Sequence, residues 1–269
     1  MKHRLKLAVA ALAFCLPFAA EAHRAWMLPS ATVLSGSDPW VTVDAAISND
    51  LFYFEHHPMR LEGLSISAPD GHAVEAENRS TGRYRSTFDV HLTQSGTYKL
   101  AIVNSGLFAS YKENGEMKRW RGSAASFAKE VPAKAENLQV TQADNRLEVF
   151  VTAGNPSQQV LAPTGKGLEL APVTHPNDLF AGEAASFRLL LDGKPAAGVK
   201  VSVIPGGIRY RDQLNEMTFT TDADGAFSVT WPAPGMYWLS ASHGDDKATV
   251  APAKQRRASY TATLEVLAP

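Results

Sequence analysis

Histidines are the side chains with the clearest capacity for chemistry in this sequence, and most of them fall in one half of the chain. Apart from His3, they are His23, His56, His57, His72, His91, His175 and His243. Imidazole is the commonest protein ligand for copper, nickel, cobalt, zinc and iron, and it is largely neutral near pH 7. The concentration between residues 23 and 91 therefore suggests a transition-metal site in the N-terminal half.

The first 22 residues have the composition of a secretory signal peptide. Three basic residues precede an almost unbroken apolar stretch from 7 to 20, and Ala20-Glu21-Ala22 forms an A-x-A cleavage site. Cys15 would suit a lipoprotein, but the bulky residue before it and the cleavage site after it favour simple cleavage. We therefore predict export, to a bacterial periplasm, of a chain that begins at His23.

Cleavage after Ala22 would give His23 a second nitrogen ligand. As the terminal residue it offers its α-amine and ring Nδ1 to one ion, closing a six-membered chelate that an internal histidine cannot form. One more imidazole would complete a three-nitrogen site suited to copper, or a planar site suited to nickel(II). Signal peptidases leave many kinds of residue at a new terminus, so the alternative is a terminal histidine without a role.

Three further histidines are candidates for completing the site. His56 and His57 follow the aromatic segment 48–54, and in a loop limited by Pro58 both could turn toward one ion, or one could bind it while the other orients its partner. The alternative is a solvated loop with packed aromatic side chains. His91 lies on a predicted strand and points away from the core, where an exposed histidine more often has no ligand.

The ligand candidates are thus His23, His56, His57 and His91, for nickel, cobalt, copper or iron. The sequence has no G-x-S-x-G, H-E-x-x-H, Walker or Rossmann motif, so we predict no enzymatic activity.

Composition excludes several other classes of protein. The chain has 269 residues, 45% hydrophobic and 20% charged, with a formal net charge of −1, which is typical of a soluble globular protein and not of a disordered or collagenous one. Removing the signal peptide takes away three basic residues, one acidic residue and the single cysteine, which leaves a net charge of −3. Disulfides and thiolate ligands are then excluded. No run of Lys or Arg exceeds two residues, so we expect no nucleic-acid partner.

From residue 40 onward, the sequence shows short strand patterns separated by turns at steps of about ten residues. These strands must position the histidines. They predict an all-β sandwich architecture, with strands at 41–47, 84–92, 97–103, 146–151, 186–191, 199–204 and 260–266. Turn signals occupy 69–72, 191–194 and 222–225, the last of which lacks the spacing of a calcium loop. The one predicted helix begins at Ala124 and is stopped early by Pro132.

An internal repeat predicts two related domains. Phe88 to Leu92 followed by Gly96 to Leu100 matches Phe227 to Trp231 followed by Gly235 to Leu239, with an offset of 139 residues. The repeat reads as a strand, a Gly-led turn and a returning strand with a tyrosine near the corner. We therefore predict two tandem immunoglobulin-like β-sandwich domains, at 23–155 and 168–269, joined by a linker at 156–167 after the signal peptide 1–22.

Four stretches of the sequence resemble the DUF4198 family: 22–29, 48–52, 170–182 with His175-Pro-Asn-Asp, and 231–238. The His-x-x-Trp-x-x-Pro pattern from His23 to Pro29 is the most specific of them. The resemblance implies an exported protein, described in the family as a periplasmic component of nickel or cobalt uptake, acting beside a membrane transporter or TonB-dependent receptor. It implies no catalytic residue, and His23 is the position that both arguments select.

Three functions remain to be weighed. The first is a periplasmic divalent-metal-binding protein that assists uptake through the His23 chelate. The second is a non-catalytic interaction module that binds a transporter or receptor without tight metal binding. The third is a copper oxidase that acts on a polymer through the same terminal histidine.

Overall fold

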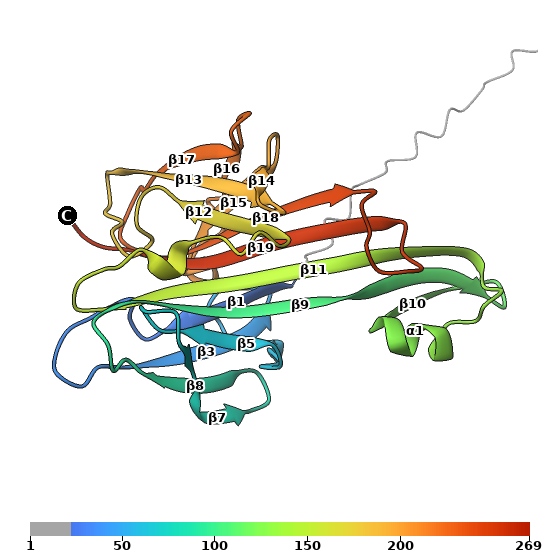
Figure 1. Ribbon diagram of the computed structural model, residues 1–269, viewed down its shortest axis with the longest axis horizontal. Helices are drawn as coiled ribbons and strands as arrows, with labels where there is room; N and C mark the ends of the chain where they lie inside the picture. The colour runs from blue at the N-terminus through green and yellow to red at the C-terminus, as the bar shows by residue number, and fades with distance from the viewer. Residues whose placement is uncertain (1–22) are drawn as a thin grey trace, which may run out of the picture.

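The computed structural model describes residues 23–269, so the predicted signal peptide and Cys15 lie outside the described residues. The regular structure of the described chain is mostly β-strand, in three sheets (Figure 1). The first sheet has the order β1 (Arg24–Pro29), β3 (Trp40–Ser48), β8 (Ser86–His91) and β7 (Glu77–Thr81), with β4 (His57–Pro58) also on β3. The third contains β12 (Leu168–Pro172), β13 (Ala184–Leu191), β14 (Lys194–Pro195) and β17 (Ala226–Thr230).

The second sheet is the largest and crosses the whole molecule. Its order is β16 (Met217–Thr220), β15 (Lys200–Pro205), β18 (Gly235–Asp245), β19 (Gln255–Val266), β11 (Glu136–Ala153), β9 (Gly96–Glu113), β5 (Leu64–Ser67) and β6 (Ala73–Val74), with β10 (Glu116–Gly122) on β9 and β2 (Val33–Leu34) on β11. The helical segments are α1 (Ala124–Glu130), η1 (Gln159–Leu161) and η2 (Ile208–Tyr210). Within residues 23–269, none of the helices has the length and apolar character needed to cross a membrane.

Two hydrophobic cores lie on this second sheet. One packs the first sheet against β5, β9 and β11, with Phe88, Tyr98 and Val149 fully buried, and takes its residues from 27–153. The other packs the third sheet against β15, β18 and β19, around Phe187 and Tyr260, and takes its residues from 168–266. The chain therefore builds two β-sandwiches that share one sheet.

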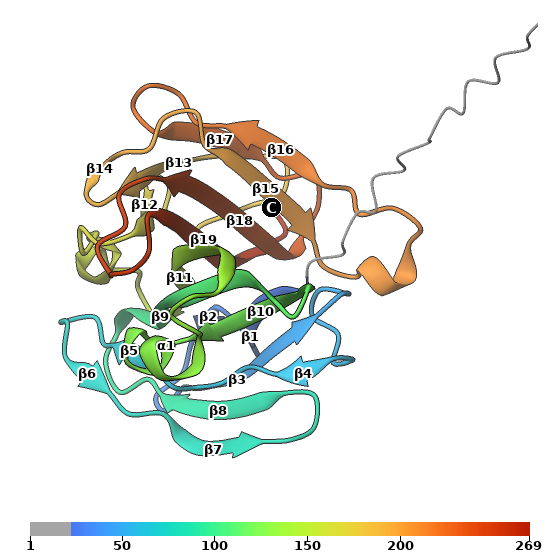
Figure 2. The ribbon, with the colours of Figure 1, turned by 90° about the vertical axis from the view of Figure 1, so that its right-hand side faces the viewer.

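The two sandwiches meet where β11 and β19 pair in parallel, with Arg146 opposite Tyr260 and Leu147 opposite Thr261. Successive side chains on a strand point to opposite faces. Leu147 belongs to the first core and Tyr260 to the second, so the two cores lie on opposite faces of the shared sheet. Figure 1 shows this as a layered molecule, with the third sheet above β11 and β19 and the first sheet below, and Figure 2 shows the same layers end on.

The internal repeat corresponds to matching corners in the two sandwiches. Gly96 and Gly235 have φ of 135° and 137°, a conformation that favours glycine, and the tyrosine two residues later is buried in both cores. The Tyr98 hydroxyl accepts from the N–H of Gln94, and the Tyr237 hydroxyl donates to the carbonyl of Ala233. In each case the chain passes from an outer sheet to the shared sheet, so the returning strand of the repeat lies in a different sheet from the strand before it.

The predicted strands are present, but two of them extend much further than expected. β9 and β11 each continue beyond the first sandwich and, with β10 and α1, form an arm with its own small core of Ala109, Tyr111 and Val131 (Figure 1). The helix α1 ends at Glu130, two residues before Pro132. The predicted turn at 191–194 is also present, with φ of 51° at Asp192 and 76° at Gly193.

Candidate metal centre

The ends of three strands place His23 beside His56 and His57. β1 pairs with one edge of β3, where Arg24 lies opposite Ser48, and β4 pairs with the other edge, where His57 lies opposite Ile47. His23 immediately precedes β1, and His56 immediately precedes β4. Two segments that are far apart in the sequence therefore bring their histidines to the same end of the first sheet.

The three imidazole rings lie next to one another, with His56 close to both of the others. The rings of His23 and His56 stack with centroids 3.8 Å apart and planes 6° apart. The ring of His57 lies 4.1 Å from that of His56 and 6.1 Å from that of His23. All three side chains are exposed. We call these three residues the histidine cluster.

The electrostatics of the cluster favour an uncharged central ring. Partial desolvation lowers the pKa of His56 from its ordinary value, and the nearby positive charges that His23 and His57 would carry lower it further, while Glu55 acts in the opposite direction. A neutral imidazole presents the lone pair that a metal ion needs. His56 is therefore biased toward the form that binds metal.

The segment before His56 is held by a closed set of contacts. The carboxylate of Glu55 accepts hydrogen bonds from the backbone N–H groups of Asn49 and Asp50, both at 2.8 Å. Ser48 accepts from the indole of Trp26 at 2.8 Å and donates to the carbonyl of Asp50 at 2.6 Å. These contacts fix the loop while His56 and His57 stay exposed.

The aromatic residues of this segment anchor it to the second sandwich. Phe52 and Phe54 pack against the fully buried Trp26, in a cluster that includes Ile204 and Trp238. Phe52 has φ of 62°, and a Cβ on Gly206 would lie 2.9 Å from its ring, so glycine leaves the space that this ring fills. This packing therefore holds the loop in one position at the junction of the two sandwiches.

The donor set of the cluster fits a transition metal, although its rings are not arranged around one point. Among residues 23–269, no three His, Cys, Asp or Glu side chains are placed to hold an ion as they stand. Stacked rings direct their lone pairs along parallel planes, so binding one ion requires the exposed rings to rotate about their side-chain bonds. Such rotations are fast in exposed residues.

His91 lies apart from the cluster. It pairs with Trp40 at the opposite end of β3 from Ser48, and a strand rises about 3.3 Å per residue, which places the two ends roughly 26 Å apart. The His91 ring stacks on Trp40 at 4.2 Å, and its Nε2 lies 2.5 Å from an oxygen of Asp38. His91 was a ligand candidate on residue type, and the register of β3 separates it from the other three.

His175, within the family-like stretch 170–182, has a structural role at the junction of the sandwiches. Its Nδ1 accepts from the N–H of Asn177 at 3.1 Å, and its Nε2 lies 3.1 Å from the hydroxyl of Thr97 and 3.2 Å from the carbonyl of Ser157. Asn177 also donates to the carbonyl of Phe150 at 2.9 Å. His175 and Asn177 are buried, and they tie the second sandwich to the first.

The sequence did not single out the arginines near the cluster. Arg60 follows His57 in the same segment, so its closeness to the cluster could have been noticed. Arg121 comes from β10 in the arm, and no local pattern connects it with His57. Both side chains line a cavity that His57 also lines.

The comparisons with known proteins identify a family. The family model for a domain of unknown function, DUF4198, matches residues 20–245. No curated protein matches the chain. The D0-D1 domain of intimin is 11% identical over 90% of this chain and 97% of that chain, with a TM-score of 0.22. The D00-D0 domain of intimin is 11% identical over 91% of this chain and 100% of that chain, with a TM-score of 0.21.

A further similar structure is the alpha-2-macroglobulin of E. coli in its native conformation, which is 11% identical over 91% of this chain and 22% of that chain, with a TM-score of 0.21. Likenesses with TM-scores this low carry no argument about this chain. The predicted all-β class with two β-sandwiches is confirmed by the sheets and the two cores of the described residues.

Proposed function

This chain belongs to the DUF4198 family, and we propose that it is a periplasmic protein that binds a divalent transition-metal ion through the histidine cluster and assists its uptake. The observation that supports this proposal is the contact between His23, His56 and His57, with ring centroids 3.8 to 6.1 Å apart. After cleavage at the predicted site, the α-amine of His23 would supply a fourth nitrogen.

The chemistry of this set selects among metals. Imidazole and amine nitrogens are ligands of intermediate softness, which suit nickel, cobalt, copper and iron better than magnesium or calcium. The exposed position suits a protein that must give the ion up, because a donor to an importer needs access to both solvent and partner. We propose a membrane transporter or TonB-dependent receptor as that partner, and a binding role without catalysis.

The terminal chelate is tested with two forms of the protein. Correctly processed protein, beginning at His23, is titrated calorimetrically with NiCl₂ beside the same protein carrying one extra residue before His23. We expect the extension to weaken binding at least tenfold, about 1.4 kcal/mol, because it converts the amine into an amide. Equal affinities would rule out the chelate.

The cluster itself is tested by a matched pair of substitutions. His56→Ala removes the ring that touches both other histidines, and we expect it to weaken nickel binding at least tenfold, about 1.4 kcal/mol. His91→Ala removes a half-buried histidine at the far end of β3 and serves as the control, with unchanged affinity expected. If the two variants bind nickel equally well, the cluster is not the site.

The arm favours a second candidate, a non-catalytic interaction module. β9, β10, β11 and α1 project beyond the first sandwich, and Met117 on β10 is 59% exposed (Figure 1). A module of this kind would be captured by its membrane partner and would bind nickel no more tightly than a histidine-poor control protein. Tight binding at the cluster decides against this alternative.

A further inference from the structure

A cavity of about 730 Å³ borders the histidine cluster. It lies between the end of the first sheet, where Ile47 and His57 line it, and the strands β9, β10 and β11 where they leave the first sandwich. Its volume falls in the range of cavities that hold small organic ligands. Because His57 belongs to both the cavity wall and the cluster, a molecule in the cavity would lie next to a metal ion at the cluster.

The charged groups of the cavity are mainly positive. Its charged lining residues are Arg60, Arg121 and Glu62, and His57 also lines it. Both guanidinium groups are exposed, and within residues 23–269 neither forms an ion pair, whereas Arg79 nearby pairs with Glu75 at 3.4 Å. Two free guanidinium groups from different elements, with one carboxylate, give the cavity a net positive charge.

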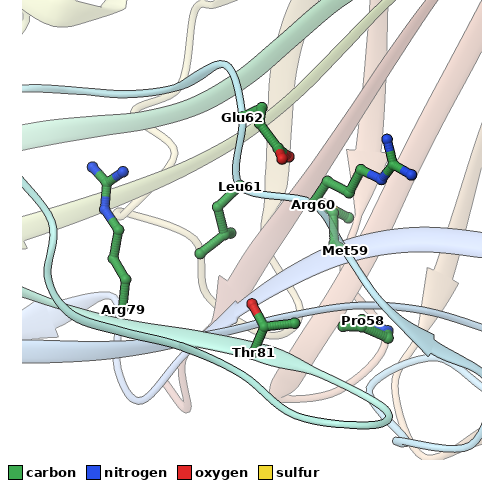
Figure 3. Close-up of a pocket in the computed structure, with 7 residues that line it drawn as sticks. All are labelled: Pro58, Met59, Arg60, Leu61, Glu62, Arg79 and Thr81. Atoms are coloured by element: carbon green, nitrogen blue, oxygen red, sulfur yellow. The ribbon is translucent and has the colours of Figure 1, made fainter. Parts of the chain in front are cut away.

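A smaller hollow of about 410 Å³ shares part of this wall. It is lined by the segment 58–62 and by Arg79 and Thr81 of β7, and Figure 3 shows Arg60 turned away from Arg79. Arg60 lines both spaces, but Arg79 lines the smaller one alone. Arg79 is therefore a matched control for any role assigned to Arg60.

Arg121, the second arginine of the cavity, comes from the arm and lies on the face that does not pack against α1. Arg121 lies opposite Phe108 on β9, and Arg119 lies opposite Ser110, so both arginines share the face of the arm that Phe108 occupies. The apolar groups that pack against α1, including Ala109 and Tyr111, are on the other face. The positive charge of the cavity thus continues along the outer face of the arm.

This charge distribution has a consequence for the form in which the ion arrives. A bare divalent cation is repelled by guanidinium groups, and sites for bare cations usually contain carboxylates. A guanidinium instead pairs with carboxylates, often through two parallel hydrogen bonds. The neighbourhood of the cluster is therefore better suited to a metal ion that carries an anionic ligand.

We propose that the ion is bound as a complex with a small polycarboxylate chelator. Arg60 and Arg121 pair with its carboxylates in the cavity, and His57 replaces a water on the metal ion. This inference rests on the proposed metal-binding function and names the substrate class of the same site.

Calorimetric titration with three probes tests the inference: NiCl₂, citrate alone, and nickel citrate, each against processed protein. We expect Arg60→Gln and Arg121→Gln each to weaken nickel citrate binding at least tenfold while leaving the affinity for NiCl₂ within twofold. Arg79→Gln should change neither. Citrate alone should bind at least tenfold more weakly than nickel citrate. Thermal melting of each variant controls for folding, which substitution of an exposed arginine should leave intact.

The outcomes separate the inference from the function it rests on. If both arginine variants bind nickel citrate as the unaltered protein does, while NiCl₂ still binds at the cluster, only the polycarboxylate complex is refuted. If citrate alone binds as tightly as nickel citrate, the cavity is an anion site independent of the metal and the inference is again wrong. If the unaltered protein binds neither form of nickel, the proposed metal function fails first.

Discussion

His56 lies between two other imidazoles, and this position determines what the cluster can do. Three rings within 3.8 to 6.1 Å of each other cannot all be protonated without mutual repulsion. Partial desolvation and then this repulsion lower the pKa of His56. A divalent ion removes this repulsion by replacing several protons with one shared charge. The contact between the rings therefore favours a metal-bound cluster over a protonated one.

His175 provides a prediction about pH. Burial lowers its pKa from the ordinary value of 6.5, while hydrogen bonding to Ser157 and the charge of Asp178 oppose the shift. Below pH 6.5 the unfolded chain takes up a proton that the folded protein resists, so the free energy of unfolding should fall as the pH falls, by at most about 1.4 kcal/mol per pH unit. The effect ends below the folded pKa.

His175→Asn checks this prediction, because its amide oxygen can accept from Asn177 as Nδ1 does. Urea unfolding of both proteins is followed between pH 5 and pH 8. The free energy of unfolding of the variant should decline less steeply below pH 6.5 than that of the unaltered protein. Near pH 8, where histidine is neutral in both the folded and the unfolded state, the difference between the two proteins should no longer change with pH. Parallel curves over the whole range would show that His175 does not contribute to the pH dependence of the free energy of unfolding.

Residue types alone predicted part of the candidate site. The grouping of His23, His56 and His57 as candidates follows from their chemistry and from their shared half of the chain. The separation of His91 could not be predicted, since it depends on how far along β3 each neighbour pairs. Arg121 was missed for the same reason, because it approaches His57 only through the folding of the arm.

At the scale of elements, the segment 48–57 holds the histidine cluster in position at the end of β3. β4 contains only two residues, so two backbone pairs on β3 could not by themselves fix the position of His56. The two hydrogen bonds to Glu55 and the packing of Phe52 and Phe54 on Trp26 supply the remaining constraint. The cluster therefore depends on the order of this loop.

Glu55→Ala tests that dependence. It removes an acceptor that serves two part-buried N–H groups, and we expect a loss of about 1–2 kcal/mol in the free energy of unfolding and several-fold weaker nickel binding. Glu75→Ala, which removes an exposed partner of Arg79, is the matched control and should change stability by less than about 1 kcal/mol. Urea unfolding and calorimetry measure both effects. Similar results for the two variants would mean that Glu55 does not organise the loop.

The sequence predicted the existence of the strands better than their extent or connections. The alternation in β3 and the Asp-Gly turn at Asp192 specify local structure directly. The outer part of β9 buries one face, with Ala109 and Tyr111, and exposes the other. The predicted strand ended too early because the polar stretch 104–106 interrupts the apolar pattern before this outer part begins. The repeat around Gly96 and Gly235 was found, but its route between sheets depends on distant partners.

At the scale of the whole molecule, the shared sheet joins the sandwiches more closely than a linker would. Arg146 and Glu148 on β11 face the second sandwich, where Arg146 lies 3.1 Å from Glu148 and 3.4 Å from Glu169 of β12. The Tyr260 hydroxyl donates to Glu148 at 3.0 Å, and burial, together with the charge of Glu148, raises the pKa of that hydroxyl well above its ordinary value. No sequence pattern predicts this parallel pairing, because its partners lie more than a hundred residues apart.

Arg146 is expected to couple the unfolding of the two sandwiches. Its guanidinium is buried and also donates to the hydroxyl of Thr164 and the carbonyl of Lys166, so Arg146→Ala leaves two buried carboxylates without their cation. Removing one partner of a buried pair costs about 3–5 kcal/mol. Scanning calorimetry should show one transition for the unaltered protein and a large decrease in its midpoint for the variant.

Arg257→Ala is the control for this experiment, because Arg257 is an exposed residue on β19 and should leave the midpoint nearly unchanged. Two separate transitions in the unaltered protein would show that the pairing of β11 with β19 does not make the sandwiches one cooperative unit. A single transition that Arg146→Ala splits into two would instead locate the coupling at the charged contacts. In that case the junction around Phe52 and Trp238 would be too weak to hold the sandwiches together, and nickel binding at the nearby cluster should weaken in parallel.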